Sequence, residues 1–510
     1  MIERADVVVA GAGLGGLSAA AHLAVAGHDV LVLEHHSVPG GYAHEFTRKG
    51  FRFEVSLHAL DGAGPGGWLH GLLAGLGVLD RVELRRLDPL YTARFPGRQV
   101  TAHADPAAYR DELVGHFPGE QAGIDSLVAA IDRVGDEVAA LQQRRATGER
   151  PGTFEIAAGY PAMAKAFTRS WSDFMDAHVA DPELRAVVST LWGYFGLPPS
   201  RLHAGTFALG WRSYHRTGGW YPVGGSRALS RALEATILEH GGRIRYRQTV
   251  TGVETAGGRV AALLTERGLR AEGRAFVSNA SPRDTLAWIE PGVLPDDYRT
   301  ALTDDVPALS NLVVYLGVAR DPAADGWDHH EFFLVEDYDV EADYAAAMSG
   351  DFARTGMVIT DYTRSDPGCA PPGKSVLALM TLAPWDHEDV WGTGGNLAGY
   401  RRNPAYLRLK REAGDILIDR AARVLPGLRE VVEVAEVATP LTNVRYARNP
   451  AGSIYGREQT VENMFAGRRS PRTPIPNLAL CGAWISGGGM STALQSGRAA
   501  ARAAERALRG

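Results

Sequence analysis

The sequence predicts an α/β protein with at least two domains, and three observations support this. The chain has 510 residues, of which 45% are hydrophobic and 22% charged, and a single hydrophobic core stops growing beyond about 250–300 residues. Residues 6–34 follow the pattern strand, glycine turn, helix, strand. Near the other end, residues 478–481 form an apolar run that leads through a glycine-rich turn to a helical segment. Strands that alternate with helices are typical of a parallel sheet covered by helices.

The first of these motifs has the spacing GxGxxG. An apolar strand at residues 7–10 precedes it, and a helix predicted over residues 17–26 follows it. A tight turn requires Gly11, close approach of a diphosphate requires Gly13, and close packing of helix on strand favours Gly16. The free N–H groups at the start of the helix then face the diphosphate. The motif predicts a dinucleotide site, and its predicted contacts are Gly11, Gly13, Leu14, Gly15 and Gly16.

An acidic residue follows the second strand. Glu34 lies 23 residues after Gly11, where its carboxylate can accept hydrogen bonds from a ribose. The acid favours an unphosphorylated ribose, so FAD or NAD fits better than NADP. A glycine-rich loop in an unrelated sheet protein is the alternative. Gly40 and Gly41 follow after a short loop, and this second pair is typical of FAD proteins that resemble glutathione reductase and the amine oxidases. We include His35 among the predicted contacts.

The middle of the chain predicts further strands and a helical layer. Residues 46–58 alternate with the period of a strand, and we expect them to pass close to the cofactor as a strand or hairpin. Residues 105–143 and 181–191 have helical periodicity and predict an inserted helical layer. Residues 228–280 read as helix, hairpin and strand, which returns the chain to the dinucleotide-binding domain. Additional strands are expected near residues 311–318, 331–335 and 375–382.

Motifs in the second half resemble one group of flavoproteins. Tyr221-Pro222 with Gly224-Gly225, the Gly241-Gly242 turn and residues 277–280 resemble the phytoene desaturase group, which includes carotenoid isomerases and retinol saturases. Residues 439–443 and 474–482 are most similar to the retinol saturase and carotenoid isomerase members. The similarity covers essentially the whole chain in the same order.

This resemblance implies a fold and a division of the chain into two domains. We expect a Rossmann-like FAD-binding domain of the glutathione-reductase/amine-oxidase type with a mixed α+β substrate domain. The FAD-binding domain is assigned to residues 1–75, 215–290 and 440–510. The substrate domain, with its helical cover, is assigned to residues 76–214 and 291–439.

The resemblance also gives the C-terminal helix a role. In similar proteins the N-terminal end of this helix points at the pyrimidine edge of the flavin and stabilises negative charge on the reduced ring. Those proteins usually have an acid after the first glycine of the motif, but here Ala483 stands there, so only a backbone contact carries over. The alternative is a helix that is merely capped by glycines. The further candidate flavin contacts are Ser56, Leu57, His58, Val250, Asn279, Gly482, Ala483, Gly489, Met490 and Ser491.

Flavin redox chemistry needs a placed substrate, exclusion of water and, for saturation or isomerisation, a proton donor. His58 and Tyr221 are the candidate catalytic residues; a hydrogen-bonded buried histidine and a core aromatic are the other interpretations. Residues 329–331, His-His-Glu, predict a solvated loop or strand edge rather than a metal site. The aromatic residues that we assign to the substrate pocket are Trp192, Tyr194, Phe195, Trp211, Trp220 and Tyr221; the first four wall an apolar tunnel or form a patch that docks on a membrane.

The predicted function is hydride transfer between FAD and a carbon of an apolar, isoprenoid-like alkene or polyene. Desaturation, saturation and isomerisation all stay open. One alternative is a flavin amine oxidase acting on an amine or an amino-acid-derived substrate. The sequence shows no clear carboxylate-binding arginine, which argues against it, and Arg212 stays open as such a residue. The other is a non-catalytic lipid-binding protein of the Rab-escort type.

Composition and net charge limit the kinds of partner and metal site that we expect. The net charge of −6 gives no electrostatic reason to expect nucleic acid. Cys369 and Cys481 are the only cysteines, which argues against a disulfide framework or a cysteine-rich metal site. The chain shows no secretory signal pattern and no apolar run of about 20 residues. We expect a cytoplasmic protein with a lipophilic small-molecule substrate.

Overall fold

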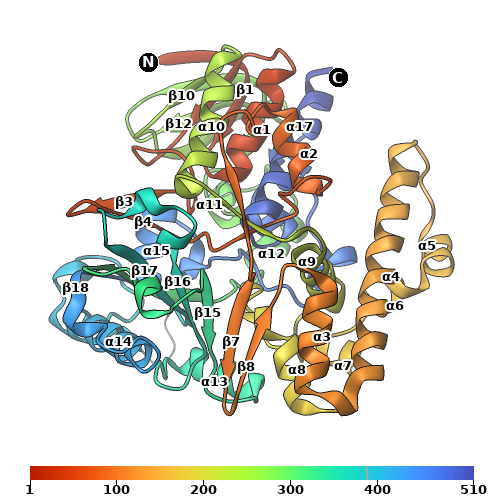
Figure 1. Cartoon of the computed structure of the whole chain (residues 1–510). Coiled ribbons are helices and arrows are strands. Elements are labelled where there is room, and N and C mark those ends of the chain that lie inside the picture. The colour runs from red at the N-terminus through yellow and green to blue at the C-terminus, as the bar shows by residue number, and fades with distance from the viewer. Residues whose placement is uncertain (386–388, 510) are drawn as a thin grey trace.

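The computed structural model describes residues 1–385 and 389–509, and two large sheets dominate it (Figure 1). In the described residues the first sheet has the order β10-β2-β1-β13-β12-β11, and β19 pairs with β13. Strands β10, β2, β1, β13 and β19 run parallel, and β11 and β12 are antiparallel additions. Its strands are β1 (Ile2–Ala10), β2 (Val30–Leu33), β10 (Arg243–Arg245), β11 (Val250–Ala256), β12 (Arg259–Thr265), β13 (Arg270–Ser278) and β19 (Leu478–Leu480).

This sheet forms because its central strands are continuous apolar runs. Val7, Val8 and Val9 of β1 are fully buried, which is typical of a parallel strand with helices on both faces. The carboxyl ends of β1, β2 and β13 lead directly to Gly11, Glu34 and Asn279. Ligands of open parallel sheets bind outside these ends, so the sheet brings three distant segments to one edge.

Helices pack closely on the first sheet. A Cβ added at Gly497 of α17 would lie 2.2 Å from the carbonyl oxygen of Gly15 of α1, so the two helices pack with their backbones in near contact. Helices α1 and α10 each begin three residues before the predicted start, at Leu14 and Gly225. The helices of this half are α1 (Leu14–Val25), α2 (Trp68–Gly75), α10 (Gly225–Glu239), α16 (Ala483–Ser486) and α17 (Met490–Arg509).

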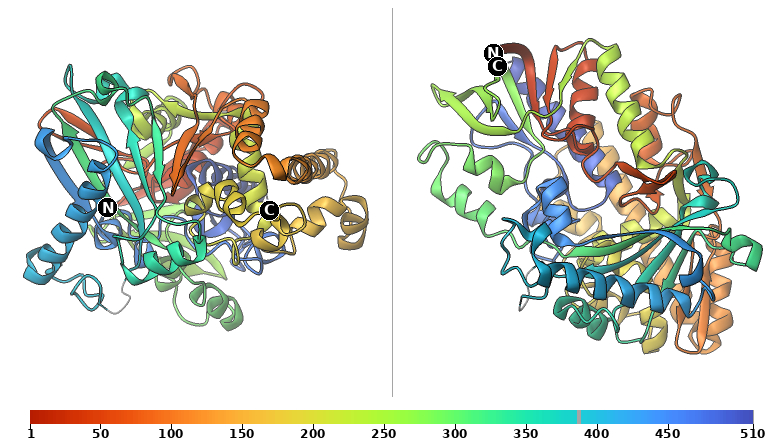
Figure 2. Two further views of the ribbon diagram at one scale, coloured as in Figure 1. Left: turned by 60° about the horizontal axis from the view of Figure 1, so that its bottom comes forward. Right: turned by 90° about the vertical axis from the view of Figure 1, so that its left-hand side faces the viewer.

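The second sheet is mixed, as predicted. Its order in the described chain is β18-β14-β17-β16-β15-β7-β8, and only the β15–β7 pair is parallel. The expected strands near 311–318, 331–335 and 375–382 are confirmed, and four more belong to the sheet. Helix α14 (Pro404–Ala422) covers one face (Figure 2). The strands are β7 (Tyr91–Phe95), β8 (Arg98–Ala102), β14 (Ser310–Val318), β15 (Glu331–Leu334), β16 (Met357–Asp361), β17 (Ser375–Ala383) and β18 (Val432–Ala438).

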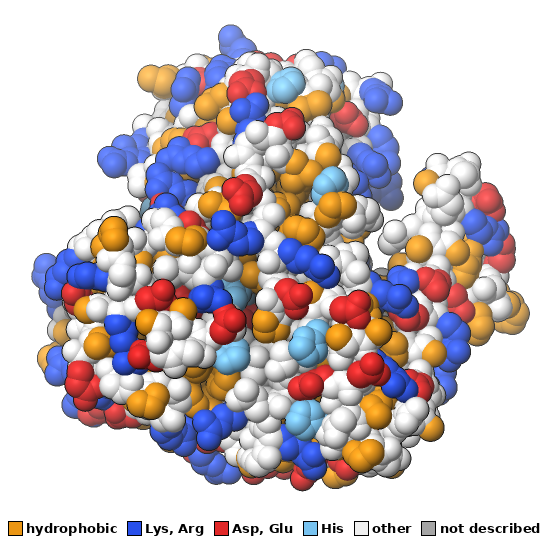
Figure 3. Space-filling model, in the orientation of Figure 1, with side chains coloured by type: hydrophobic (Ala, Val, Ile, Leu, Met, Phe, Trp, Pro, Cys, Tyr) orange, Lys and Arg blue, Asp and Glu red, His pale blue; other side chains and the backbone are white. Residues whose placement is uncertain are grey.

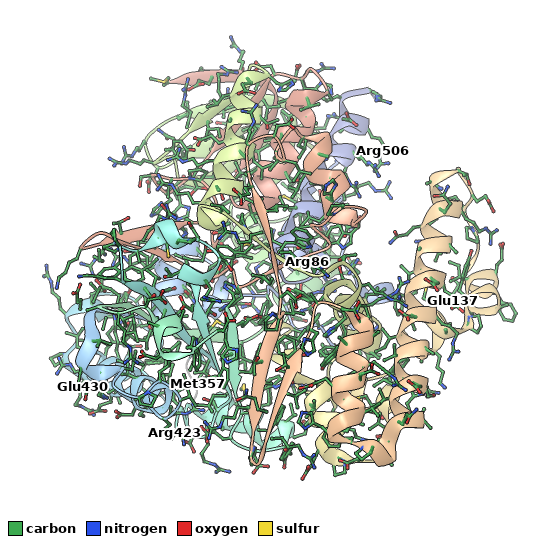
Figure 4. All side chains as sticks on the ribbon, in the orientation of Figure 1. Arg86, Glu137, Met357, Arg423, Glu430 and Arg506 are labelled. Atoms are coloured by element: carbon green, nitrogen blue, oxygen red, sulfur yellow. The ribbon has the colours of Figure 1, made fainter. Side chains whose placement is uncertain are left out.

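The predicted helical layer is confirmed and includes a projecting arm. The end of α4 and helix α5 stand apart from the body (Figures 1 and 3). Glu137, on α4 in Figure 4, accepts a hydrogen bond of 2.7 Å from the backbone N–H of Met163 and so ties α6 to the arm. The layer comprises α3 (Pro106–His116), α4 (Gln121–Ala146), α5 (Thr153–Gly159), α6 (Pro161–Ala166), α7 (Trp171–Met175), α8 (Pro182–Val188) and α9 (Ala204–Thr217).

Small elements join the two halves. The expected hairpin after Gly41 is β3 with β4, and strands β5, β9 and β6 form a short separate sheet. Among the described helices, none is both long and apolar enough to cross a bilayer. The remaining elements are β3 (Glu45–Arg48), β4 (Phe51–Glu54), β5 (Leu60–Asp61), β6 (Leu84–Leu87), β9 (Gly219–Pro222), α11 (Pro282–Ala287), α12 (Asp296–Thr303), α13 (Val340–Ser349) and α15 (Pro440–Ala447).

Candidate active site

A large cavity opens at the carboxyl edge of the first sheet. Its volume is about 1280 Å³, which exceeds the roughly 300–1,000 Å³ of a usual small-molecule site. It is lined by Gly11 and Glu34 after β1 and β2, by Ile156 and Met163 in the helical layer and by Met380 of β17. The cavity therefore has room for more than one small molecule and connects the dinucleotide motif with both sheets.

The glycine turn is packed against one asparagine. A Cβ added at Gly13 would lie 2.6 Å from the side-chain nitrogen of Asn279, and one added at Gly15 would lie 2.4 Å from its side-chain oxygen. The backbone of the turn is thus held in close contact with the end of β13. Gly40 donates its N–H to the carbonyl oxygen of Ala12 at 2.7 Å, so the second glycine pair lies beside the first.

The start of α1 fits an anion. Gly13 is the N-cap residue in an extended conformation, and no side chain caps the helix. The first N–H groups of a helix have no partners within it, so they are free to donate to a phosphate. This end of the 12-residue helix borders the cavity through Leu14 and Gly15.

Glu34 is held ionised at the end of β2. Its side-chain oxygens accept hydrogen bonds from the backbone N–H groups of Ala12 at 2.6 Å and His36 at 2.7 Å, and the ring of His35 lies 2.9 Å away. Burial acts to raise the pKa of this carboxyl, but the hydrogen bonds from His35, His36 and Ala12 outweigh it and lower the pKa. A buried carboxylate in this position suits the hydroxyl groups of a ribose.

A buried polar cluster lies behind the wall of the same cavity. His58 is 8% exposed and lines the cavity, and its Nδ1 lies 2.7 Å from the hydroxyl of Thr360. Burial, with a smaller effect of nearby His330, lowers the pKa of His58 to about 3, so its imidazole is neutral at physiological pH. Glu331, 1% exposed, accepts a hydrogen bond from the hydroxyl of Tyr194. Sequence patterns singled out His58 and Tyr194 separately and placed Glu331 in a solvated edge. They did not bring the three together, because these residues come from distant segments.

Comparison with known proteins decides the family. The family described as flavin containing amine oxidoreductase matches residues 14–392 and 415–504. This chain belongs to that family. It is a flavin-dependent oxidoreductase, and its cofactor is FAD.

Relatives and solved structures agree with this assignment. The chain is 30% identical to phytoene dehydrogenase of Streptomyces griseus, over 97% of this chain and 94% of that protein. It is 25% identical to all-trans-retinol 13,14-reductase of Danio rerio, over 94% of this chain and 82% of that protein. A structure of putrescine oxidase with bound putrescine superposes with a TM-score of 0.66 at 15% identity, and the match covers 100% of both chains. The last similarity concerns the fold alone.

The residues present fit FAD. Of the predicted FAD contacts, all except Gly16 line the cavity. A Cβ added at Gly16 would lie 2.0 Å from the carbonyl oxygen of Gly11, so this glycine permits close packing beneath the turn. The contacts that line the cavity are Gly11, Gly13, Leu14, Gly15, Glu34, His35, Gly40, Gly41, Ser56, Leu57, His58, Val250, Asn279, Gly482, Ala483, Gly489, Met490 and Ser491. Their binding roles stay predictions.

Sequence reasoning missed cavity residues near Glu34. The rings of His36 and His44 lie 6.0 Å apart, and the ring of Tyr446 lies 5.9 Å from that of His36. All three line the cavity. Tyr446 follows β18 and is brought here only by tertiary folding, so no local motif marks it.

Four predicted pocket residues do not line the cavity. Tyr221, 1% exposed, packs against the rings of His330 and Tyr362, which removes it from the wall where a proton donor is needed. Trp220 donates its indole N–H to the carbonyl oxygen of Thr217 at 2.8 Å. The other two are Trp192 and Trp211, which are 8% and 6% exposed and belong to the core of the helical layer.

Two further interpretations need correction. Because Trp192 and Trp211 are buried, they form no patch that docks on a membrane; Tyr194 and Phe195, by contrast, line the cavity. Residues 329–331 are not a solvated edge, since His330 and Glu331 are 6% and 1% exposed and Glu331 begins the interior strand β15. No cluster suited to a metal ion occurs among the described residues.

Proposed function

We propose that this protein transfers a hydride between FAD and a carbon of an apolar, conjugated isoprenoid-like substrate, and so desaturates, saturates or isomerises it. One observation carries the proposal: a single cavity is lined both by the dinucleotide motif and by apolar residues at the helical layer, among them Leu141, Met163 and Phe167. The names of the relatives, a phytoene dehydrogenase and a retinol 13,14-reductase, support the same class of substrate.

The residues of this chain have separate tasks in that reaction. FAD supplies two-electron chemistry when it is bound. The start of α1 and Glu34 hold its diphosphate and a ribose, and the segment Ser56 to His58 lines the reacting region. The apolar residues at the helical layer orient the polyene beside the cofactor, which is the main requirement for hydride transfer.

An amine is the second candidate substrate, and the structure disfavours an amino-acid-derived amine whose carboxylate would be bound by Arg212. Arg212 lines the cavity, but its guanidinium lies 3.2 Å from Asp132 and is also bonded to Asp136. This arginine is therefore already paired and is a poor site for the carboxylate of an amino-acid-derived substrate.

Peripheral membrane contact is part of the proposal. Phe154, on α5 of the projecting arm, is 91% exposed, and neighbouring Ile156 lines the cavity. We expect the Phe154→Ser variant to float less with phosphatidylcholine vesicles than the wild type. Equal flotation of both proteins would contradict membrane contact through the arm.

Product analysis tests the function. The FAD-loaded protein is mixed anaerobically with all-trans-retinol, once oxidised and once after chemical reduction. A retinoid product that has lost or gained two hydrogen atoms, or has unchanged mass and a different retention time, supports desaturation, saturation or isomerisation respectively. Quantitative recovery of unchanged retinol and of a carotenoid such as lycopene, alongside conversion of benzylamine, would replace the proposal by the amine candidate.

A further inference from the structure

The buried cluster behind the cavity wall contains a carboxyl group that the proposed function leaves without a task. Glu331 lies on β15, 1% exposed. Its Oε1 accepts the hydroxyl hydrogen of Tyr194 and lies 3.5 Å from Nδ1 of His58. Within the described residues, no lysine or arginine nitrogen lies within 4.0 Å of this carboxyl. A buried carboxyl without a cation is costly as an anion, so its surroundings favour the protonated form.

His58 both lies next to this carboxyl and lines the cavity. Its ring is stacked between Tyr194 and Tyr362, with centroids 5.9 Å and 6.4 Å away. Its Nδ1 faces Glu331 and Thr360, whereas its Nε2 is buried and has no hydrogen-bond partner in the described structure. Among the described residues, Nε2 is therefore the ring nitrogen that is left without a partner, in a side chain that lines the cavity.

The surroundings of Glu331 fix where the mobile proton resides. Burial raises the pKa of Glu331 to about 8, with Tyr194 acting in the opposite direction, so the carboxyl holds a proton at neutral pH. Burial lowers the pKa of His58 to about 3 and also lowers that of His330, so both rings are neutral. Burial also raises the pKa of every phenol that faces the carboxyl, and these phenols stay neutral. They are Tyr91, Tyr194, Tyr214, Tyr362 and Tyr455.

We propose that Glu331 stores the proton of the reaction and that His58 carries it to and from the substrate carbon. In saturation, a bound reduced flavin would supply two electrons to one alkene carbon as a hydride. The neighbouring carbon takes the proton from Nε2 of His58, while Nδ1 takes the carboxyl proton of Glu331. The π bond of the alkene breaks together with three bonds to hydrogen, one each on the hydride donor, on Nε2 of His58 and on Glu331. Two C–H bonds and one N–H bond at Nδ1 form, and the carboxylate that remains is held by the hydroxyl of Tyr194. Desaturation follows the same path in reverse.

His58 is thus the catalytic residue and Glu331 a positioning residue that acts through it. The inference rests on the proposed function, because it needs a substrate carbon that gains or loses a proton. It assigns a role to a buried acid that sequence patterns had placed in a solvated edge.

Infrared spectroscopy of the FAD-loaded protein tests whether Glu331 holds a proton, and it needs no substrate. We expect a carbonyl band of a protonated carboxyl that disappears as the pH rises through about 8. The Glu331→Gln variant should lack this band. The matched control Asp343→Asn, which removes another acid whose pKa burial raises, to about 6, should keep it. Identical bands in the wild type and in Glu331→Gln would overturn the inference.

Stability against pH gives a second readout that does not depend on turnover. The folded protein holds a proton on Glu331 that the unfolded chain, with its ordinary pKa, releases above about pH 4.5. Stability from this group is therefore fully present below that pH and is lost as the pH rises towards 8. The melting temperature of Glu331→Gln should fall less than that of the wild type between pH 5 and pH 8. Parallel falls would contradict a proton on this carboxyl.

Single-turnover kinetics tests the relay itself, that is, the transfer of the proton from Glu331 through His58 to the substrate carbon. With chemically reduced protein and all-trans-retinol, Glu331→Gln and His58→Gln are expected to slow product formation about 10²–10⁴-fold, the usual contribution of general acid catalysis. Glu331→Asp should recover part of the rate, and retinol affinity should change little. Wild-type rates in both variants would overturn the relay. A wild type that shows the infrared band but never converts retinol or lycopene would overturn the proposed function, and the relay with it.

Discussion

Replacing Gly13 by valine is expected to yield a folded protein that has lost most of its flavin. The first carbon of the new side chain would lie 2.6 Å from the side-chain nitrogen of Asn279. Asn279 is already in contact on its other side, where its side-chain oxygen lies 3.5 Å from the sulfur of Cys481. Overpacking of this kind costs about 1–3 kcal/mol, and a loss of that size in FAD binding would be about 5–160-fold in affinity.

The flavin-to-protein ratio of the purified variant measures this effect. Gly71→Val is the matched control, because no atom lies within 4 Å of a Cβ at that position on the exposed side of α2. We expect the control to retain the wild-type ratio. Full flavin occupancy in Gly13→Val would show that the glycine turn does not hold the diphosphate.

Replacing Asp305 by alanine is expected to have the largest effect on stability. Its carboxylate lies 3.0 Å from Arg457 and 2.8 Å from Arg469, and the side chains of Asp305 and Arg457 are only 3% and 5% exposed. Removing one partner of a buried pair leaves an uncompensated charge and costs about 3–5 kcal/mol. The pair also anchors residues 457–469, which contribute Met464 and Arg468 to the cavity wall.

Thermal unfolding of the FAD-loaded protein checks this expectation. Glu412→Ala removes a control ion pair with Arg408, whose two side chains are 54% and 60% exposed; such helix pairs contribute only about 0.3–0.5 kcal/mol. We expect a marked fall in the melting temperature for Asp305→Ala and almost none for the control. Equal shifts in the two variants would mean that the buried pair does not anchor this loop.

The sequence predicted best those features whose residues lie close together in the chain. Gly11, Gly13 and Glu34 lie within one strand-turn-helix-strand unit, so their spacing alone defines the chemistry of a dinucleotide site. The strands at Ser310–Val318 and Ser375–Ala383 could be predicted equally well, because long apolar runs of this length predict buried strands.

The rest of the site depends on tertiary contacts that no local pattern encodes. Trp192 and Tyr194 are two residues apart, yet the tryptophan is buried in the helical core and the tyrosine faces the cavity. Glu331 resembles a surface residue in sequence, but its cross-strand neighbour Thr360 and the distant His58 enclose it. Burial depth at these positions is set by packing between segments that lie more than 100 residues apart.

The absorption spectrum of the purified protein, recorded before and after anaerobic addition of all-trans-retinol or lycopene, tests the central claim most directly. That claim is that one cavity holds FAD and an apolar polyene side by side. We predict a visible flavin band in the wild type that the polyene bleaches or shifts, or that the polyene restores after chemical reduction, while benzylamine leaves it unchanged. A protein without a flavin band, or a band that responds to the amine and to neither polyene, would contradict the account.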